Sequence, residues 1–77
     1  MKETIRIEGE TITLGQFLKH ATIISSGGMA KPFLAEYDVW VNGERENRRG
    51  KKLRHGDTVE VEEVGQFIVE SNQSGEK

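Results

Sequence analysis

The sequence predicts an α+β fold in which two short helices pack on a small, mainly antiparallel sheet. Three observations lead to this prediction. Polar and apolar residues alternate in several short runs, two stretches carry apolar residues at helical spacing, and an Asn-Gly dipeptide follows one of the alternating runs. At 77 residues the chain is expected to form a single domain over residues 1–70, with a flexible tail at residues 71–77.

The first two elements follow from local patterns. Residues 4–8 alternate between polar and apolar side chains, which is typical of a half-buried strand. Thr13 and Gln16 have the three-residue spacing of a capping box and predict the start of a helix. The apolar residues of this helix recur at i, i+3, i+4 and i+7, and they are Leu14, Phe17, Leu18 and Ala21.

A second helix is expected after the Ser-Ser-Gly-Gly stretch at residues 25–28, with Ser26 as its cap. Its apolar stripe consists of Ala30, Phe33, Leu34 and Tyr37. Pro32 lies inside this stretch, and a proline removes a backbone donor and clashes with the preceding turn of a helix. We therefore expect either a late start of the helix or a kink at Pro32.

The second half of the chain is predicted to form strands. Residues 38–41 lead into Asn42-Gly43, a dipeptide that favours a type I′ hairpin, and a return strand is expected from residue 44 to about residue 48. Trp40 alternates with two valines, so its indole should lie on the face opposite to the core, where it either packs on a neighbouring strand or stacks on a base. The remaining strands are expected at residues 58–62 and 66–69, after a turn at residues 55–57.

Composition limits the classes of site that the chain can hold. The absence of cysteine excludes a disulfide, a thiolate zinc site and a cysteine nucleophile, and it fits a cytoplasmic protein. No run approaches the roughly 18 apolar residues of a membrane span, so no membrane contact is expected. We find no paired nucleophile and base, phosphate-binding glycine loop or metal-ligand spacing, and we expect neither an enzyme nor a cofactor or metal.

Positive charge is concentrated in one stretch. The formal net charge is −2, yet six of the eleven Lys and Arg residues lie between residues 45 and 54, against the single acid Glu46. These six residues are Arg45, Arg48, Arg49, Lys51, Lys52 and Arg54. A polyanion would therefore meet one basic face on an otherwise acidic molecule. On charge alone, a solvated face and a nucleic-acid surface both fit this cluster.

The order of these features resembles the S4 RNA-binding domain, and more narrowly the small stand-alone S4-like proteins of the YaaA and YbcJ type. The likeness rests on the run SGGMAKPFLAEYDVWVNGERENRRGKKLRHGD and covers about residues 13–61, which would be the S4 core, or αL motif. The resemblance implies a bacterial, non-enzymatic module, expected to be a monomer. Its partner would be structured RNA, either ribosomal or tRNA-like, and it would act on or near ribosomal particles.

The resemblance also implies site residues. Two positions depart from the family pattern: Thr13-Leu14-Gly15 stands where many S4 domains have Arg-Leu-Asp, and Gly27-Gly28 stands where a basic pair often follows the serine. We therefore expect the main RNA contact at the 45–54 cluster rather than on the helices. The expected RNA-binding residues are Lys19, Ser26, Lys31, Asn42, Arg45, Arg48, Arg49, Lys51, Lys52 and Arg54.

Two alternatives from other classes remain. A protein-binding adaptor could use the same basic face for an acidic partner, and composition does not separate it from an RNA-binding module. The early strand, the helix begun at Thr13 and the later VNG and HGDTVEV runs also resemble the β-grasp sulfur-carrier proteins. Those carriers act through a C-terminal Gly-Gly, whereas this sequence ends Ser74-Gly75-Glu76-Lys77, so the carrier interpretation is the weaker one.

Overall fold

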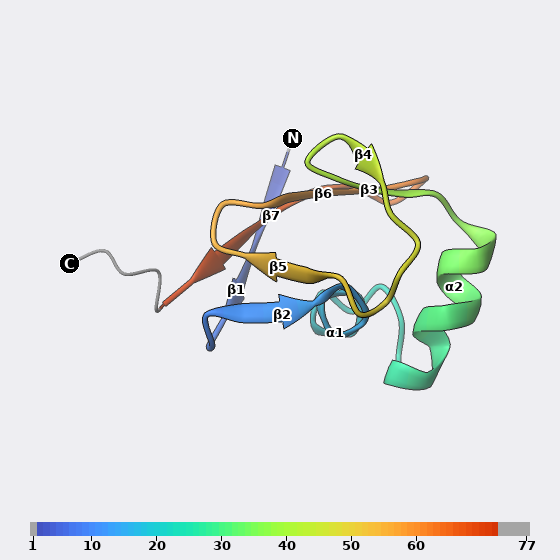
Figure 1. Ribbon diagram of the computed structural model, residues 1–77, viewed down its shortest axis with the longest axis horizontal. Helices are drawn as coiled ribbons and strands as arrows, with labels where there is room; N and C mark the ends of the chain where they lie inside the picture. The colour runs from blue at the N-terminus through green and yellow to red at the C-terminus, as the bar shows by residue number, and fades with distance from the viewer. Residues whose placement is uncertain (1, 73–77) are drawn as a thin grey trace.

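The computed structural model describes residues 2–72 and has the expected α+β fold, with two short helices packed on a mainly antiparallel sheet (Figure 1). The elements in chain order are β1 (Lys2–Ile7), β2 (Thr11–Thr13), α1 (Leu14–His20), the 3-10 turn η1 (Gly27–Met29), α2 (Ala30–Glu36), β3 (Val39–Val41), β4 (Glu44–Arg45), β5 (Lys52–Arg54), β6 (Thr58–Val61) and β7 (Gly65–Ser71). Ser71 belongs to β7, and residues 73–77 of the expected tail lie outside the described residues.

The strands form a large sheet and a small one. The large sheet has the order β1-β7-β6-β3-β4, in which β1 runs parallel to β7 and every other pair is antiparallel. The small sheet is the antiparallel pair of β2 and β5. In Figure 1, β3, β4 and β6 lie along the top of the molecule, the pair of β2 and β5 and helix α1 lie below them, and α2 lies at the right.

The core lies between the large sheet and the elements below it. Alternate side chains of β1, β3, β5, β6 and β7 are buried in it, because the side chains of a strand alternate between the two faces. Phe17 of α1 is fully buried, and its ring meets that of Phe67 edge to face at a centroid distance of 5.9 Å. The other residues with at most 1% exposure are Leu14, Leu18, Ala30, Val39, Leu53, Val59, Val61 and Val69.

The predicted start of the first helix is confirmed. The backbone N–H of Gln16 donates to the Thr13 hydroxyl at 3.2 Å, and the Gln16 side-chain oxygen accepts from the Thr13 backbone N–H at 3.4 Å, which completes the capping box. The second helix starts late, as Pro32 required. Its first residue is Ala30, so Pro32 lies in the first turn, where helical N–H groups have no partner within the helix.

Three details of the sequence prediction are wrong. Ser26 precedes η1, but its side chain makes no capping hydrogen bond, because a 3-10 turn rather than the α-helix follows it. The return strand of the hairpin ends at Arg45 instead of reaching residue 48. No strand was predicted between the hairpin and the turn at residues 55–57, where the basic stretch contains β5, or at residues 11–13, which form its partner β2.

The turn between β3 and β4 has the predicted type I′ character, since Asn42 and Gly43 both have positive φ angles, 52° and 87°. Side chains also tie this turn to the next one. The Asn42 side-chain oxygen accepts from the backbone N–H of Thr58 at 2.9 Å, and its amide group donates to Asp57 at 3.2 Å. Asp57 in turn accepts from the backbone N–H of Arg54 at 2.9 Å.

Gly15 lies where three segments meet. A Cβ atom at this position would lie 3.3 Å from the Cβ atoms of both Ala30 and Arg49. A side chain here therefore has to push apart α1, the start of α2 and the loop that carries Arg49.

We predict that Gly15→Val lowers the free energy of unfolding by about 1–3 kcal/mol, because its branched side chain overpacks this contact. Gly50→Val is the matched control, since a Cβ atom on Gly50 has no neighbour within 4 Å. Urea denaturation of the two variants and the parent chain measures the difference. Equal midpoints for the two variants would contradict the tight contact at Gly15.

Candidate nucleic-acid interface

A hollow of about 410 Å³ lies between the side of α1 and the entry to α2. It is lined by Thr13, Gly15, Gln16, Lys19, Gly27, Ala30 and Arg49. These residues come from three separate parts of the chain: the first helix, the glycine turn before the second helix, and the basic stretch. The fold thus brings Lys19 and Arg49, which are thirty positions apart in the sequence, to one cavity.

Backbone hydrogen bonds hold the basic stretch against α1. The N–H of Leu14 donates to the carbonyl of Lys51 at 2.7 Å, and the N–H of Gly15 donates to the carbonyl of Arg49 at 2.9 Å. Together with the bond from Gln16 to Thr13, they satisfy the donors of the first helical turn. The N-terminus of α1 is therefore used to position Arg49, and its donors are not open to a ligand.

The pair of β2 and β5 presents two further cations. Leu53 is fully buried, so the neighbouring side chains of Lys52 and Arg54 point to the opposite, exposed face. Lys52 lies directly opposite Thr13, which lines the hollow, and residues paired in this way share a face of the sheet. Lys52 therefore borders the hollow, and Arg54 continues the same face.

Two of the six clustered cations are already paired with acids. The Nε of Arg48 lies 2.8 Å from a carboxylate oxygen of Glu46, and its Nη2 donates to the other oxygen at 3.2 Å. These hydrogen bonds hold the pKa of Glu46 below its ordinary value, although partial burial opposes the shift, and they raise the pKa of Arg48. Arg45 pairs with Asp38 at 3.1 Å.

The other expected cations have no ion-pair partner within residues 2–72. They are Lys19, Lys31, Arg49, Lys51, Lys52 and Arg54. Four of them lie at the hollow or on the exposed face of β5, and we call this group the basic ridge: Lys19, Arg49, Lys52 and Arg54. Lys51 is half-buried, so we do not count it in the ridge. The four residues of the ridge are exposed, and none of them has an acidic ion-pair partner within residues 2–72.

The structure separates the remaining expected site residues from the ridge. Ser26 and Lys31 are exposed next to two residues of the hollow, Gly27 and Ala30, and so lie at its margin. The side-chain oxygen and the side-chain NH₂ of Asn42 both make hydrogen bonds within the fold. These bonds give Asn42 a structural role that does not require RNA. Arg45 is paired across the strands with Trp40, on the large sheet rather than on the pair of β2 and β5.

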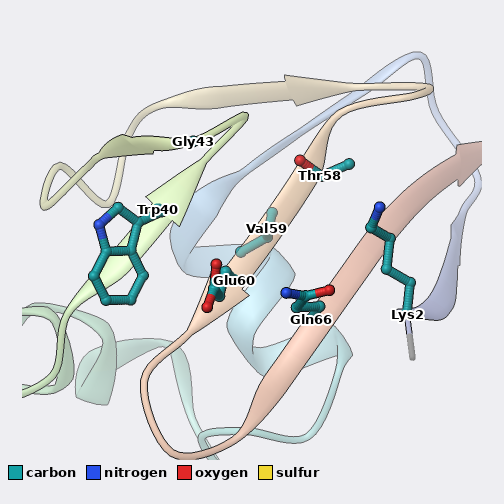
Figure 2. Close-up of a pocket in the computed structure, with 7 residues that line it drawn as sticks. All are labelled: Lys2, Trp40, Gly43, Thr58, Val59, Glu60 and Gln66. Carbon is teal, nitrogen blue, oxygen red and sulfur yellow. The ribbon is translucent and has the colours of Figure 1, made fainter.

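Trp40 lies on the face predicted for it. Val39 and Val41 are buried and Trp40 is half-buried on the other side of β3, so the indole is on the outer face of the large sheet. Figure 2 shows Trp40 with Glu60, Gln66 and Lys2 around a pocket of about 190 Å³ on this face. An acid and a base share this pocket, so it lacks the single-sign charge of the ridge.

Of the seven residues that line the hollow, the sequence predicted Lys19 and Arg49 as site residues and missed the other five, which are Thr13, Gly15, Gln16, Gly27 and Ala30. Thr13 and Gln16 were recognised only as a helix cap. A signal for the ridge was present, because both Thr11-Ile12-Thr13 and Lys52-Leu53-Arg54 alternate polar and apolar side chains. Each run is only three residues long, which is short for a strand prediction.

The arrangement is suited to binding anions. Arg and Lys side chains make charge-assisted hydrogen bonds to phosphate oxygens, and Gln16 adds a neutral donor at the same hollow. Within residues 2–72 no group of three or more His, Cys, Asp or Glu side chains could hold a metal ion. No helix in this part of the chain is long and apolar enough to cross a membrane.

Comparison with known proteins gives two findings. The family model of the S4 domain matches residues 5–70. The probable ribosome maturation protein RlbA of Bacillus subtilis (strain 168) is 59% identical over 69 residues, which make up 90% of this chain and 97% of that protein. No solved structure matches the chain.

We predict that Glu46→Gln destabilises the protein near neutral pH and has no effect in acid. The folded-state pKa of Glu46 is lowered, so its contribution to stability is complete above the ordinary value of 4.5 and is lost as the pH falls through the folded value. Denaturation of both proteins between pH 3 and pH 7 measures the difference. Glu60→Gln, at an exposed acid of β6, is the control, and a difference independent of pH would contradict the prediction.

Proposed function

Because the chain belongs to the S4 domain family, we propose that it is a non-enzymatic module that binds structured RNA through the basic ridge. The observation that carries the proposal is the convergence of Lys19 and Arg49 at one hollow, beside which Lys52 lies opposite Thr13, with no acidic ion-pair partner for these three cations within the described residues. Phosphate contacts of this kind position a protein on RNA without reading its bases. Selectivity then comes from the shape of the RNA.

A folded or double-stranded RNA fits the ridge better than a single strand does. Single-strand binding relies on aromatic side chains on which successive bases stack. No aromatic residue lines the hollow, Trp40 lies on the outer face of the large sheet, and Tyr37 is stacked on Phe33. RNA helices present phosphates and 2′-hydroxyls across an accessible minor groove, which a short basic ridge can follow.

The name of the Bacillus subtilis relative narrows the proposal further. That relative is described as a probable ribosome maturation protein, and the two sequences align over nearly their whole lengths. We therefore propose that the RNA is ribosomal and that the chain acts on maturing ribosomal particles in the cytoplasm. Direct binding to a folded ribosomal RNA fragment, with heparin and a matched single strand as competitors, tests this.

A protein-binding adaptor is the competing function, because an acidic protein surface would also be attracted to the ridge. Salt dependence does not separate the two functions, since both are electrostatic. Competition does: a folded RNA should displace a labelled folded RNA at far lower concentration than heparin of equal charge. Equal displacement by every polyanion would favour the adaptor.

We predict that the double substitution Arg49→Ala and Lys52→Ala weakens RNA binding about tenfold in moderate salt. It should also reduce the slope of log affinity against log salt concentration by about two, because two phosphate contacts are lost. Alanine keeps the Cβ atom of Arg49 that packs against Gly15, so the loop stays in place. Fluorescence anisotropy across a salt series measures both quantities.

The matched control for this experiment is the double substitution Lys2→Ala and Arg6→Ala. It also removes one lysine and one arginine, but both lie on β1, outside the ridge. The control should change the affinity less than twofold. Equal losses for the two double variants would show that net charge, and not the ridge, governs binding.

We predict a smaller effect for Lys31→Ala, a loss of affinity of a few-fold. Lys31 is exposed in the first turn of α2 and has no ion-pair partner in the described part of the chain, so it can reach a phosphate at the margin of the hollow. Its removal leaves the ridge intact. An unchanged dissociation constant would restrict the interface to the ridge.

A further inference from the structure

A second hollow, of about 520 Å³, lies where the turn between β6 and β7 approaches α2. Its walls come from the segment that follows α1, from the side of α2 and from the β6–β7 turn. They include Ile23, Phe33, Tyr37, Val64 and Phe67. None of the residues that line it lines the hollow of the basic ridge, so the two cavities are separate.

Part of the wall of this second hollow is apolar and open to solvent. Val64 is 52% exposed and Tyr37 is 38% exposed, which makes them two of the three most exposed large apolar side chains among residues 2–72. The rings of Tyr37 and Phe33 stack with their centroids 4.7 Å apart, so each restricts the motion of the other. Exposed apolar surface gathered around a cavity is typical of an interaction site.

Two left-handed turn residues line the same hollow. Three non-glycine residues in the described chain have positive φ angles, and two of them, Thr22 (60°) and Glu63 (66°), line this hollow. The third, Asn42, is explained by the hairpin turn. Thr22 follows α1 in a Schellman motif, since its N–H donates to the carbonyl of Lys19 and the N–H of Ile23 donates to that of Leu18, both at 2.9 Å, and Glu63 lies in the turn closed by the bond from Val64 to Val61. These turns fix the walls of the hollow on the side of α1 and on the side of β6.

The rim of the hollow is acidic. Glu3, Glu62 and Glu63 line it, and no basic residue does. The carboxylate of Glu62 is held in place because it accepts a hydrogen bond from the backbone N–H of Asp38 at 2.8 Å. Three carboxylates repel the phosphates of RNA and the head groups of anionic lipids, so neither is a suitable occupant.

We propose that this acid-rimmed hollow binds a protein segment in which bulky apolar side chains are flanked by lysine or arginine. The apolar side chains would pack against the exposed surfaces of Tyr37 and Val64, and the flanking cations would face the rim carboxylates. Apolar burial supplies most of the attraction in such a contact, and complementary charge sets the orientation and the choice of partner. This proposal is independent of RNA binding.

The test is a nuclear magnetic resonance titration of the full, isotope-labelled chain in the absence of RNA. The probe is the synthetic peptide Lys-Lys-Leu-Phe-Arg-Lys. The first control peptide, Lys-Lys-Ser-Gly-Arg-Lys, keeps the charge and lacks the apolar residues, and the second, Glu-Glu-Leu-Phe-Glu-Glu, reverses the charge. We expect saturable shifts at residues 21–23, 33–37 and 62–67 with the probe, and weak or absent shifts at these residues with both controls.

Three variants locate the contact. Glu63→Lys should weaken binding of the probe by at least about threefold, because it replaces an attractive charge at the rim by a repulsive one. Glu60→Lys makes the same charge change on the outer face of the large sheet, and it should leave the dissociation constant nearly unchanged. Val64→Ser should also weaken binding, because it removes exposed apolar surface without disturbing the core.

Several results would overturn the proposal. They are equal binding of the probe and the Ser-Gly control, equal effects of Glu63→Lys and Glu60→Lys, shifts that map to the basic ridge, and no shift with the probe. Self-association seen by sedimentation and abolished by Val64→Ser would assign the hollow to a contact between two copies of the chain instead. Because no RNA is present, failure here leaves the RNA proposal unaffected, and loss of RNA binding would leave this result unaffected.

Discussion

The docking of the basic stretch on the first turn of α1 is the contact on which the rest of the surface depends. Two backbone hydrogen bonds, from Leu14 to Lys51 and from Gly15 to Arg49, replace the missing helical partners of α1 with carbonyl groups of the loop. They fix where β5 begins, and β5 then pairs with β2 immediately before the helix. A side chain at Gly15 would obstruct this approach, which gives a structural reason for glycine at a helical position where it is intrinsically unfavourable.

Ion pairing, as well as position in the fold, decides which cations of the basic stretch are available to a polyanion. In the basic stretch, Glu46 pairs with Arg48, and Asp38 pairs with Arg45 from just before β3. Both arginines are largely exposed, so each pair contributes only modestly to stability, but the two pairs remove two cations from the surface that a polyanion would meet. The ridge therefore contains fewer cations of the basic stretch than the sequence of residues 45–54 suggests. It is also more sharply placed, because the cations that remain unpaired border a cavity or share one face of a short strand pair.

The sequence was sufficient for the features that depend on local chemistry. The capping box at Thr13, the type I′ turn at Asn42 and the late helix start imposed by Pro32 each follow from a few neighbouring residues. The pairing of β2 with β5 could not be predicted in the same way, because two three-residue strands are stable only through contacts between distant segments. The same limit applied to the site: Arg45 and Arg49 are four positions apart but belong to different surfaces, whereas Lys19 and Arg49 share one.

The helix α1 connects the two candidate surfaces. Its first turn holds the loop that carries Arg49, and the segment that follows its last turn forms a wall of the acid-rimmed hollow. The helix has only seven residues, and its buried side chains Leu14, Phe17 and Leu18 anchor it in the core. A helix anchored in this way fixes the distance and orientation between the two surfaces. If the ridge binds RNA, the three carboxylates at the rim of the other hollow repel the phosphates of that RNA, so the same molecule would keep RNA and a protein segment at different surfaces.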